Sequence, residues 1–199
     1  MATIKTEKGS DMISAIEAIN AINDVRSSEV VVATMTANRY WESVSNNQEM
    51  DLPVFGAMGK ASSVALGLAL SQPNKKIVVL DGDGSLLMNL GSLITVAGME
   101  PKNFLHFVFE DGAYWTTGGQ PIPGNGKFDL SAMANDAGYR STHSFEGLET
   151  LVSELPNLMK REGPIFVSIK VIHPEHAGEP FIGSTKSAME KLSKSISGN

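Results

Sequence analysis

The stretch that decides the fold is VVLDGDGSLLMNLGSL, residues 78–93. A β-branched apolar run, typical of a buried strand, leads into DGDGS at residues 81–85, and an apolar helical pattern follows at once. A tight turn explains these residue types by itself, because Asp and Gly are common turn residues. The alternative is a site in which Asp83 holds a hard cation such as Mg²⁺ while Ser85 donates a hydrogen bond to a phosphate group.

The composition limits the classes of function. A chain of 199 residues with 42% hydrophobic and 19% charged residues predicts one globular domain over residues 1–199. The formal charge of −6 argues against nucleic-acid binding, which needs a basic face. Cysteine is absent, which excludes disulfides and cysteine-ligated metal sites. No apolar run is long enough to span a membrane and the N-terminus lacks a signal-peptide core, so we expect a cytoplasmic protein with no membrane partner.

Strand and helix patterns alternate along the chain. β-Branched or aromatic runs predict buried strands at residues 29–35, 75–81, 104–110 and 164–172. Apolar residues at helical spacing predict helices at residues 11–25, 60–72, 86–98, 129–138, 145–161 and 185–196. This alternation predicts an α/β fold of three layers, with a mostly parallel sheet covered by helices on both faces.

Several boundaries of these elements follow from single residues. Ser10 is expected to cap the first helix, and Asp129 to cap the helix that ends at Gly138. Gly98 is expected to end its helix, and Pro156 to kink or break the helix that contains it. The polar residues 36–53 are expected to form a loop with one helical turn.

A second loop supports the metal site. Asp111 ends the strand after Asp83, 28 residues further on (111 − 83), so one helix and one strand separate the two loops. The loops should therefore lie side by side at the carboxyl edge of the sheet, where such folds bind ligands. Two carboxylates, a backbone carbonyl near Ala113 and two phosphate oxygens nearly complete the octahedral oxygen shell of Mg²⁺. Thr116 and Thr117 add donors for the phosphates.

The two loops together resemble the thiamine diphosphate (ThDP) motif. That family usually reads GDG, then a spacer, then a polar pair such as NN or DN after a strand; here GDGSLLMNL precedes FEDGAYWTTGGQP. Over about residues 53–123, including FGAMGKASSVALGLAL, the chain resembles 2-oxoacid decarboxylases that act on sulfopyruvate or phosphonopyruvate. The resemblance implies ThDP and Mg²⁺ as cofactors. It also implies a 2-oxoacid substrate that loses CO₂ to give an aldehyde after attack of the cofactor ylid on the keto carbon.

The resemblance also assigns roles to residues. The metal ligands it implies are the side chains of Asp83 and Asp111 and the backbone carbonyl of Ala113. The diphosphate-binding residues it implies in the two loops are Gly84, Ser85 and Thr116, and we expect the neighbouring Gly82 and Thr117 to bind the cofactor too. Gly56 matches the residue whose carbonyl binds the 4′-amino group of the aminopyrimidine. Met58 matches the bulky residue that supports the V shape of the cofactor, and an unbranched apolar side chain can fill the wedge between two rings.

The sequence departs from the family pattern at the second loop. Asp111 replaces the usual Asn and follows Glu110, which adds negative charge near the diphosphate, so we expect Glu110 to have a backbone or cationic partner. Trp115 stands where a small residue is common, and it either narrows the substrate pocket or packs against a neighbouring subunit.

Other polar residues carry weaker predictions. His106, in the middle of an apolar strand, reads as a packed core histidine. His173 and His176 follow the last strand and read as part of an exposed loop. Weaker candidates for diphosphate contacts are Thr34, Thr36 and Asn38.

The expected active site is incomplete within this chain. In the family, the glutamate that protonates N1′ of the pyrimidine ring belongs to a separate pyrimidine-binding domain, which we expect on a partner α subunit in an α2β2 or larger assembly. Two alternatives retain the cofactor: an acyloin- or acetolactate-type synthase subunit, and a catalytically silent ThDP-binding regulatory subunit. A third is a flavodoxin-like or phosphatase-type domain, which leaves the Asp83–Asp111 spacing and TTGGQP unexplained.

Overall fold

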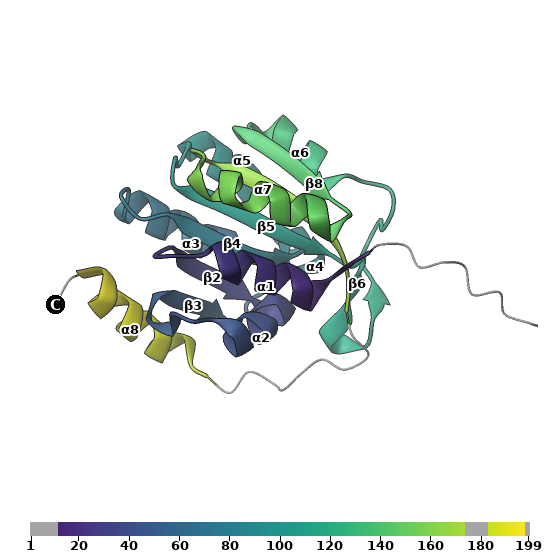
Figure 1. The fold of residues 1–199 in the computed structure, drawn as a ribbon. Helices are drawn as coiled ribbons and strands as arrows, with labels where there is room; N and C mark the ends of the chain where they lie inside the picture. The colour runs from purple at the N-terminus through teal and green to yellow at the C-terminus, as the bar shows by residue number, and fades with distance from the viewer. Residues whose placement is uncertain (1–11, 174–182, 198–199) are drawn as a thin grey trace, which may run out of the picture.

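A parallel sheet with helices on both faces forms the core of the molecule (Figure 1). The computed structural model describes residues 12–173 and 183–197. Its seven-stranded sheet has the order β1-β9-β5-β4-β2-β3, with β8 also paired to β9, and every pairing is parallel. The strands are β1 (Ile13–Ser14), β2 (Val30–Thr34), β3 (Asp51–Val54), β4 (Ile77–Gly82), β5 (Phe104–Glu110), β8 (Ser141–Phe145) and β9 (Ile165–Ile172). A separate antiparallel hairpin pairs β6 (Ala113–Tyr114) with β7 (Gln120–Pro121).

Each central strand is buried on both faces. In β2, Val31 and Ala33 join the core on one side of the sheet, whereas Val30 and Val32 join the core on the other. The helices of the first layer are α1 (Ala15–Val25), α2 (Met35–Val44) and α7 (Leu148–Lys160). The helices of the second layer are α3 (Ala61–Ser71), α4 (Asp83–Leu87), α5 (Ser92–Met99), α6 (Leu130–Ala137) and α8 (Thr185–Ser197). The three-layer prediction is confirmed.

Several predicted boundaries are confirmed by local hydrogen bonds. The Asp129 side chain accepts a hydrogen bond of 3.0 Å from the Ala132 N–H and so caps α6, which ends at Gly138 with φ +104°. The C-terminal helix is present as α8, and Thr185 at its start donates a 2.8 Å hydrogen bond to the Pro53 carbonyl of β3. This helix lies beside the edge strand β3 (Figure 1).

The prediction of a loop over residues 36–53 is wrong. The segment contains the ten-residue helix α2, a short 3₁₀ turn (Gln48–Met50) and strand β3. Ala37, Tyr40 and Trp41 share one helical face and are buried in the first core, so a narrow apolar stripe suffices in an otherwise polar helix. Pro53 is compatible with β3 because β3 is an edge strand.

Other boundaries differ from the prediction. The helix expected at residues 86–98 is divided into α4 and α5. Gly98 lies inside α5, and the residue after the end of α5, Glu100, has a left-handed conformation. Pro156 lies within α7 without interrupting it. The strand β8 was not predicted, because its sequence STHSF lacks a clear apolar alternation.

The first helix also begins later than predicted. It starts at Ala15 instead of Asp11, because Ile13 and Ser14 pair with the end of β9. The predicted cap Ser10 and the predicted start Asp11 lie outside the described residues. Within the described ranges, no helix combines the length and apolar character needed to cross a bilayer.

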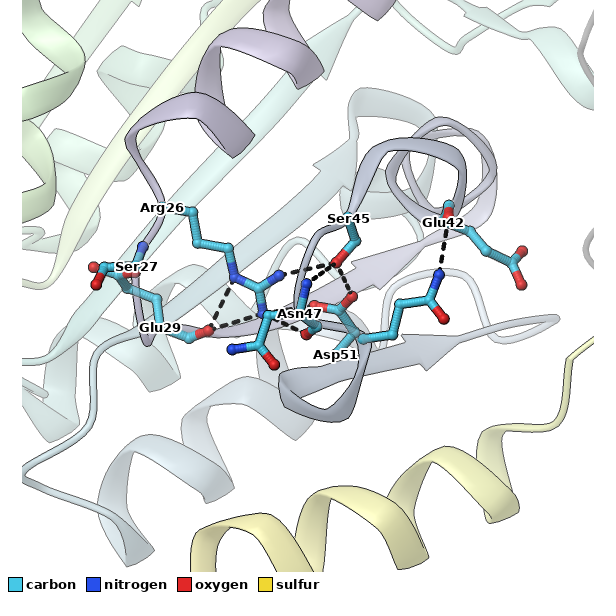
Figure 2. A network of polar contacts seen from close by, with 8 residues as sticks. Arg26, Ser27, Glu29, Glu42, Ser45, Asn47 and Asp51 are labelled. Atoms are coloured by element: carbon cyan, nitrogen blue, oxygen red, sulfur yellow. Dashed lines mark hydrogen bonds and ion pairs between the residues drawn. The ribbon is translucent and has the colours of Figure 1, made fainter.

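A buried arginine, Arg26, connects α1, α2 and β3 at the amino-terminal end of the sheet (Figure 2). The Arg26 guanidinium donates hydrogen bonds to the Glu29 carbonyl (3.0 and 3.2 Å) and to Ser45 Oγ (3.0 Å). It also forms an ion pair of 2.7 Å with Asp51 at the start of β3, and it stacks over the Trp41 ring at 5.2 Å. These contacts join the ends of α1 and α2 to β3, so they fix α2 beside the sheet.

Replacing Arg26 with Met should destabilise the chain by about 3–5 kcal/mol, because it leaves the Asp51 carboxylate buried without its cation. The double variant R26M/D51N should recover part of the loss, and urea unfolding measures both. Lys102→Met is the matched control, because its ion pair with Glu162 is exposed and 3.9 Å long, and such pairs contribute at most about 1 kcal/mol. Equal losses in R26M and K102M would contradict this account.

Candidate functional site

A cleft opens at the carboxyl edge of the sheet, beside the ends of β2 and β4. These strands are neighbours, but α2 leaves β2 toward the first layer while α4 leaves β4 toward the second. A crevice for ligands forms where neighbouring strands lead to opposite faces. The cleft encloses about 60 Å³, and residues that follow β2, β4, β5 and β9 line it.

Most of the predicted site residues meet in this cleft. It is lined by Met58, Gly82, Asp83, Gly84, Ser85, Asp111, Ala113, Thr116 and Thr117. Gly56 is the exception: it lies in an exposed turn with φ +70°, outside the set of lining residues. The topology therefore brings together two loops that the sequence separates by a helix and a strand.

Asp83 joins the two loops. Its side chain lies at the junction of β4 and α4, and the residue is only 3% exposed. Its Oδ1 accepts a hydrogen bond of 2.6 Å from the Gly84 N–H, and its Oδ2 accepts one of 2.8 Å from the Gly112 N–H of the second loop. Burial raises the pKa of Asp83 to about 7; the charges of Asp111 and Glu110 add to the shift, and the two hydrogen bonds oppose it.

The two loops contain two glycines that the local geometry requires. A Cβ on Gly84 would lie 2.7 Å from the Tyr114 ring, so the β6–β7 hairpin packs directly on the start of α4. Gly112 has φ +75°, and a Cβ there would lie 2.6 Å from the Asn125 side chain. A larger residue at position 84 would push the two loops apart, whereas a side chain at position 112 would strain the left-handed backbone and displace the Asn125 side chain.

Strand β9 and the residue that follows it, His173, supply a partner for each of two neighbouring carboxylates. Glu110 contacts Lys170 and Ser168, which confirms the expected cationic partner. Asp111 Oδ2 lies 2.7 Å from His173 Nε2, and its Oδ1 accepts a 3.0 Å hydrogen bond from the Ala113 N–H. Asp83, by contrast, has only backbone N–H donors among the contacts of the described residues.

The expectation that His173 belongs to an exposed loop is wrong. Its side chain is 7% exposed, and the centre of its ring lies 4.8 Å from that of Trp115, with the two rings tilted by 37°. Its Nδ1 lies 3.1 Å from the hydroxyl of Tyr40, which is 133 residues away in the chain, so no local pattern could have revealed the contact. His176 lies outside the described residues.

The remaining predicted residues divide between the cleft and the core. Thr36 lines the cleft, whereas Thr34 is buried and donates a 2.9 Å hydrogen bond to the Val54 carbonyl. Asn38 is buried on the other side of α2, facing a second pocket beside α8. His106 is fully buried, as predicted, with its Nδ1 3.4 Å from the Tyr139 hydroxyl.

The Ser85 hydroxyl can still donate a hydrogen bond. Its Oγ is buried and accepts a 3.0 Å hydrogen bond from the Gly59 N–H, which leaves the hydroxyl hydrogen free to donate.

Sequence reasoning missed one backbone feature of the site. Met35, the first residue of α2, lines the cleft with φ +48°. A residue with a side chain rarely adopts this left-handed conformation, and such outliers are concentrated at functional sites. The polar sequence around it gave no signal of this geometry.

The donor set fits a metal that also binds an external ligand. Within the described ranges, no three histidine or acidic side chains form a complete metal site. Asp83, Asp111 and the Ala113 carbonyl could supply part of an oxygen shell, and Mg²⁺ typically takes one or two carboxylates and completes its shell with phosphate oxygens and water. In the described part of the chain, neither lysine nor arginine lines the cleft.

Solved structures show the same fold. A putative thiamin diphosphate-dependent enzyme from Mycobacterium smegmatis superposes with a TM-score of 0.69 at 18% identity, covering 86% of this chain and 35% of that one. Benzoylformate decarboxylase from Polynucleobacter necessarius superposes with a TM-score of 0.68 at 17% identity, covering 85% and 35% of the two chains. At these identities the likeness concerns the fold alone.

Sequence comparison identifies the family. The chain is 34% identical over 189 residues to sulfopyruvate decarboxylase subunit beta of Methanothermobacter thermautotrophicus, covering 94% of this chain and 97% of that protein. It is 38% identical over 126 residues to phosphonopyruvate decarboxylase of Streptomyces hygroscopicus, covering 63% of this chain, and it spans about a third (31%) of that protein's length. The profile of the family described as "Thiamine pyrophosphate enzyme, C-terminal TPP binding domain" matches residues 29–169. The predicted resemblance is thus confirmed, and the chain belongs to the thiamine pyrophosphate enzyme family, as its C-terminal TPP binding domain.

Proposed function

We propose that this chain is the diphosphate- and Mg²⁺-binding subunit of a ThDP-dependent 2-oxoacid decarboxylase that resembles sulfopyruvate and phosphonopyruvate decarboxylases. The observation that carries the proposal is the meeting of Asp83 and Asp111 in one cleft, at the ends of β4 and β5. The hydrogen bond from the Gly112 N–H to Asp83 holds the two loops together at 2.8 Å.

The electrostatics of the cleft favour a divalent cation. Burial raises the pKa of Asp83 to about 7, so holding its negative charge in this place is unfavourable without a counter-ion. Mg²⁺ bound by Asp83, Asp111 and the Ala113 carbonyl would compensate this charge. It would also bridge to the diphosphate, which two carboxylates would otherwise repel.

The remaining lining residues suit the cofactor. The Ser85 hydroxyl and the Thr116 and Thr117 residues offer donors for diphosphate oxygens, and Met58 offers an apolar surface for the rings. When bound, ThDP supplies a carbon nucleophile and an electron sink for the loss of CO₂. The chain's own residues hold the cofactor's charged end and orient it, while Trp115 narrows the space beside it.

A partner subunit would complete the site. The cleft of about 60 Å³ is far smaller than the roughly 300–1,000 Å³ of a ligand pocket, so this chain encloses only part of the cofactor. No glutamate is among the described residues that line it, so the group that protonates N1′ would come from a pyrimidine-binding α subunit. The relative that matches along 97% of its length is itself named a beta subunit. We expect an α2β2 or larger cytoplasmic assembly.

The substrate would be a small 2-oxoacid. Because the described cleft has no lysine or arginine, a sulfonate or phosphonate group on the substrate would have to be bound by cations of the partner. A synthase that joins two such molecules is the alternative, supported by 35% identity over 85 residues to a probable acetolactate synthase of Oryza sativa.

The test is to purify the chain with its partner and assay 2-oxoacids in the presence of ThDP and Mg²⁺. We expect CO₂ and an aldehyde in equal amounts from the complex, none from the chain alone, and at least about a 100-fold lower rate in D83A, which loses a metal ligand. An acyloin product would favour the synthase. A complex that binds ThDP without turnover would favour the silent subunit, and a complex that binds no ThDP would overturn the proposal.

The stability of the metal-free chain should depend on the proton of Asp83. The pKa rises from an ordinary 3.8 to about 7 on folding, so the folded state binds this proton more tightly than the unfolded chain between these values. The stabilisation is therefore fully present below about pH 4 and is lost as the pH rises through about 7. Saturating Mg²⁺ and ThDP should restore the lost stability, because they bind the charged form.

Urea unfolding of wild type and D83N from pH 5 to pH 8 measures this effect. The variant has no carboxyl proton to lose, and titrating groups that do not interact with Asp83 cancel in the difference between the two proteins. The free energy of unfolding of wild type should fall relative to that of D83N as the pH rises. A difference that stays constant over this range would contradict the account.

A further inference from the structure

We propose that His173, itself held by Tyr40 and Trp115, is a positioning residue for Asp111 and so tunes the affinity of the metal site. The inference rests on the proposed function, because it assigns Asp111 a metal to bind. It concerns the residue that follows β9 and a helix, α2, that the sequence motifs of the site do not include.

The hydrogen-bond directions of the cluster follow from its chemistry. An ionised carboxylate can only accept hydrogen bonds, so the 2.7 Å contact requires His173 Nε2 to donate to Asp111 Oδ2. In the neutral ring Nδ1 is then the acceptor, and the Tyr40 hydroxyl, 3.1 Å away, donates to it. With His173 neutral, each donor in this cluster thus points toward Asp111: the Tyr40 hydroxyl to His173, and His173 to Asp111.

Packing fixes the plane of the His173 ring. The Trp115 ring lies 4.8 Å from it at an angle of 37°, and the Tyr40 ring lies 5.7 Å from it at 32°. Tyr40 is 5% exposed and belongs to the buried face of α2. The imidazole therefore contacts two aromatic rings from different segments, and these contacts restrict the directions in which its Nε2–H can point.

This arrangement presents Asp111 in one orientation. Oδ2 accepts from His173 and Oδ1 accepts from the Ala113 N–H, so neither oxygen can rotate without breaking a hydrogen bond. A carboxylate has about four lone-pair sites, so both oxygens retain capacity for a cation. Partners that orient metal-binding carboxylates in this way typically change metal affinity by about 10–100-fold.

The cluster also accounts for Trp115. A small residue at this position would leave one face of the His173 ring without a partner. In this chain the His173 ring contacts both the bulky Trp115 and the Asp111 carboxylate, and so it connects these two residues.

The experiment measures Mg²⁺ affinity in the full-length chain together with its partner, at saturating ThDP, by isothermal titration and by competition with Mn²⁺ followed by electron paramagnetic resonance. His173→Ala should weaken Mg²⁺ binding by about 10–100-fold. His173→Gln should recover most of the loss, because its amide Nε2–H can donate to Asp111. Tyr40→Phe, which keeps the ring and removes the hydroxyl, should weaken binding by a smaller factor in the same direction.

Two further variants separate the possible failures. His143→Ala is the matched control, because His143 lies on β8 outside the cleft and should leave Mg²⁺ affinity unchanged. Asp83→Ala should abolish Mg²⁺ binding.

The outcomes distinguish the two proposals. If wild type binds no Mg²⁺ with ThDP, the proposed function fails. If D83A loses binding while H173A, H173Q and Y40F all stay within twofold of wild type, the positioning role fails and the proposed function stands. If H173A does not fold, the H173Q and Y40F affinities decide.

Discussion

The hydrogen bond from the Gly112 N–H to the Asp83 carboxylate is the contact on which the site depends. It joins a loop after β4 to a loop after β5, and it forms because the two strands are parallel neighbours whose ends meet at one edge. The glycines allow this approach, since a Cβ on Gly84 would meet the Tyr114 ring at 2.7 Å. This junction brings together the two loops that carry the residues proposed to bind the metal and the diphosphate.

Three carboxylates lie at this edge of the sheet, and they differ in the partners that the chain provides for them. Glu110 has Lys170 of β9 as its counter-ion, and Asp111 has as a donor the imidazole of His173, the residue after β9. Asp83 has backbone N–H groups alone among its described contacts, and burial raises its pKa. The fold thus supplies a counter-ion for Glu110 and a hydrogen-bond donor for Asp111, and it leaves Asp83, the most buried of the three, for the proposed Mg²⁺.

Much of the fold and the central part of the site could be predicted from sequence, because the signals are local. The buried strands are continuous apolar runs, and the DGDGS turn lies between a strand and a helix in the sequence itself. The helix α2 was not predicted, because only three of its apolar side chains are buried and the rest of the segment is polar. The role of His173 could not be predicted, since it depends on Tyr40, Asp111 and Trp115, which only the folded chain brings together.

The most direct measurement is a crystal structure of the chain with its partner, ThDP and Mg²⁺. This account predicts one Mg²⁺ bound by oxygens of Asp83, Asp111 and the cofactor diphosphate at about 2.0–2.1 Å. A cofactor bound with its diphosphate elsewhere, or with both aspartates out of contact with the ion, would contradict it.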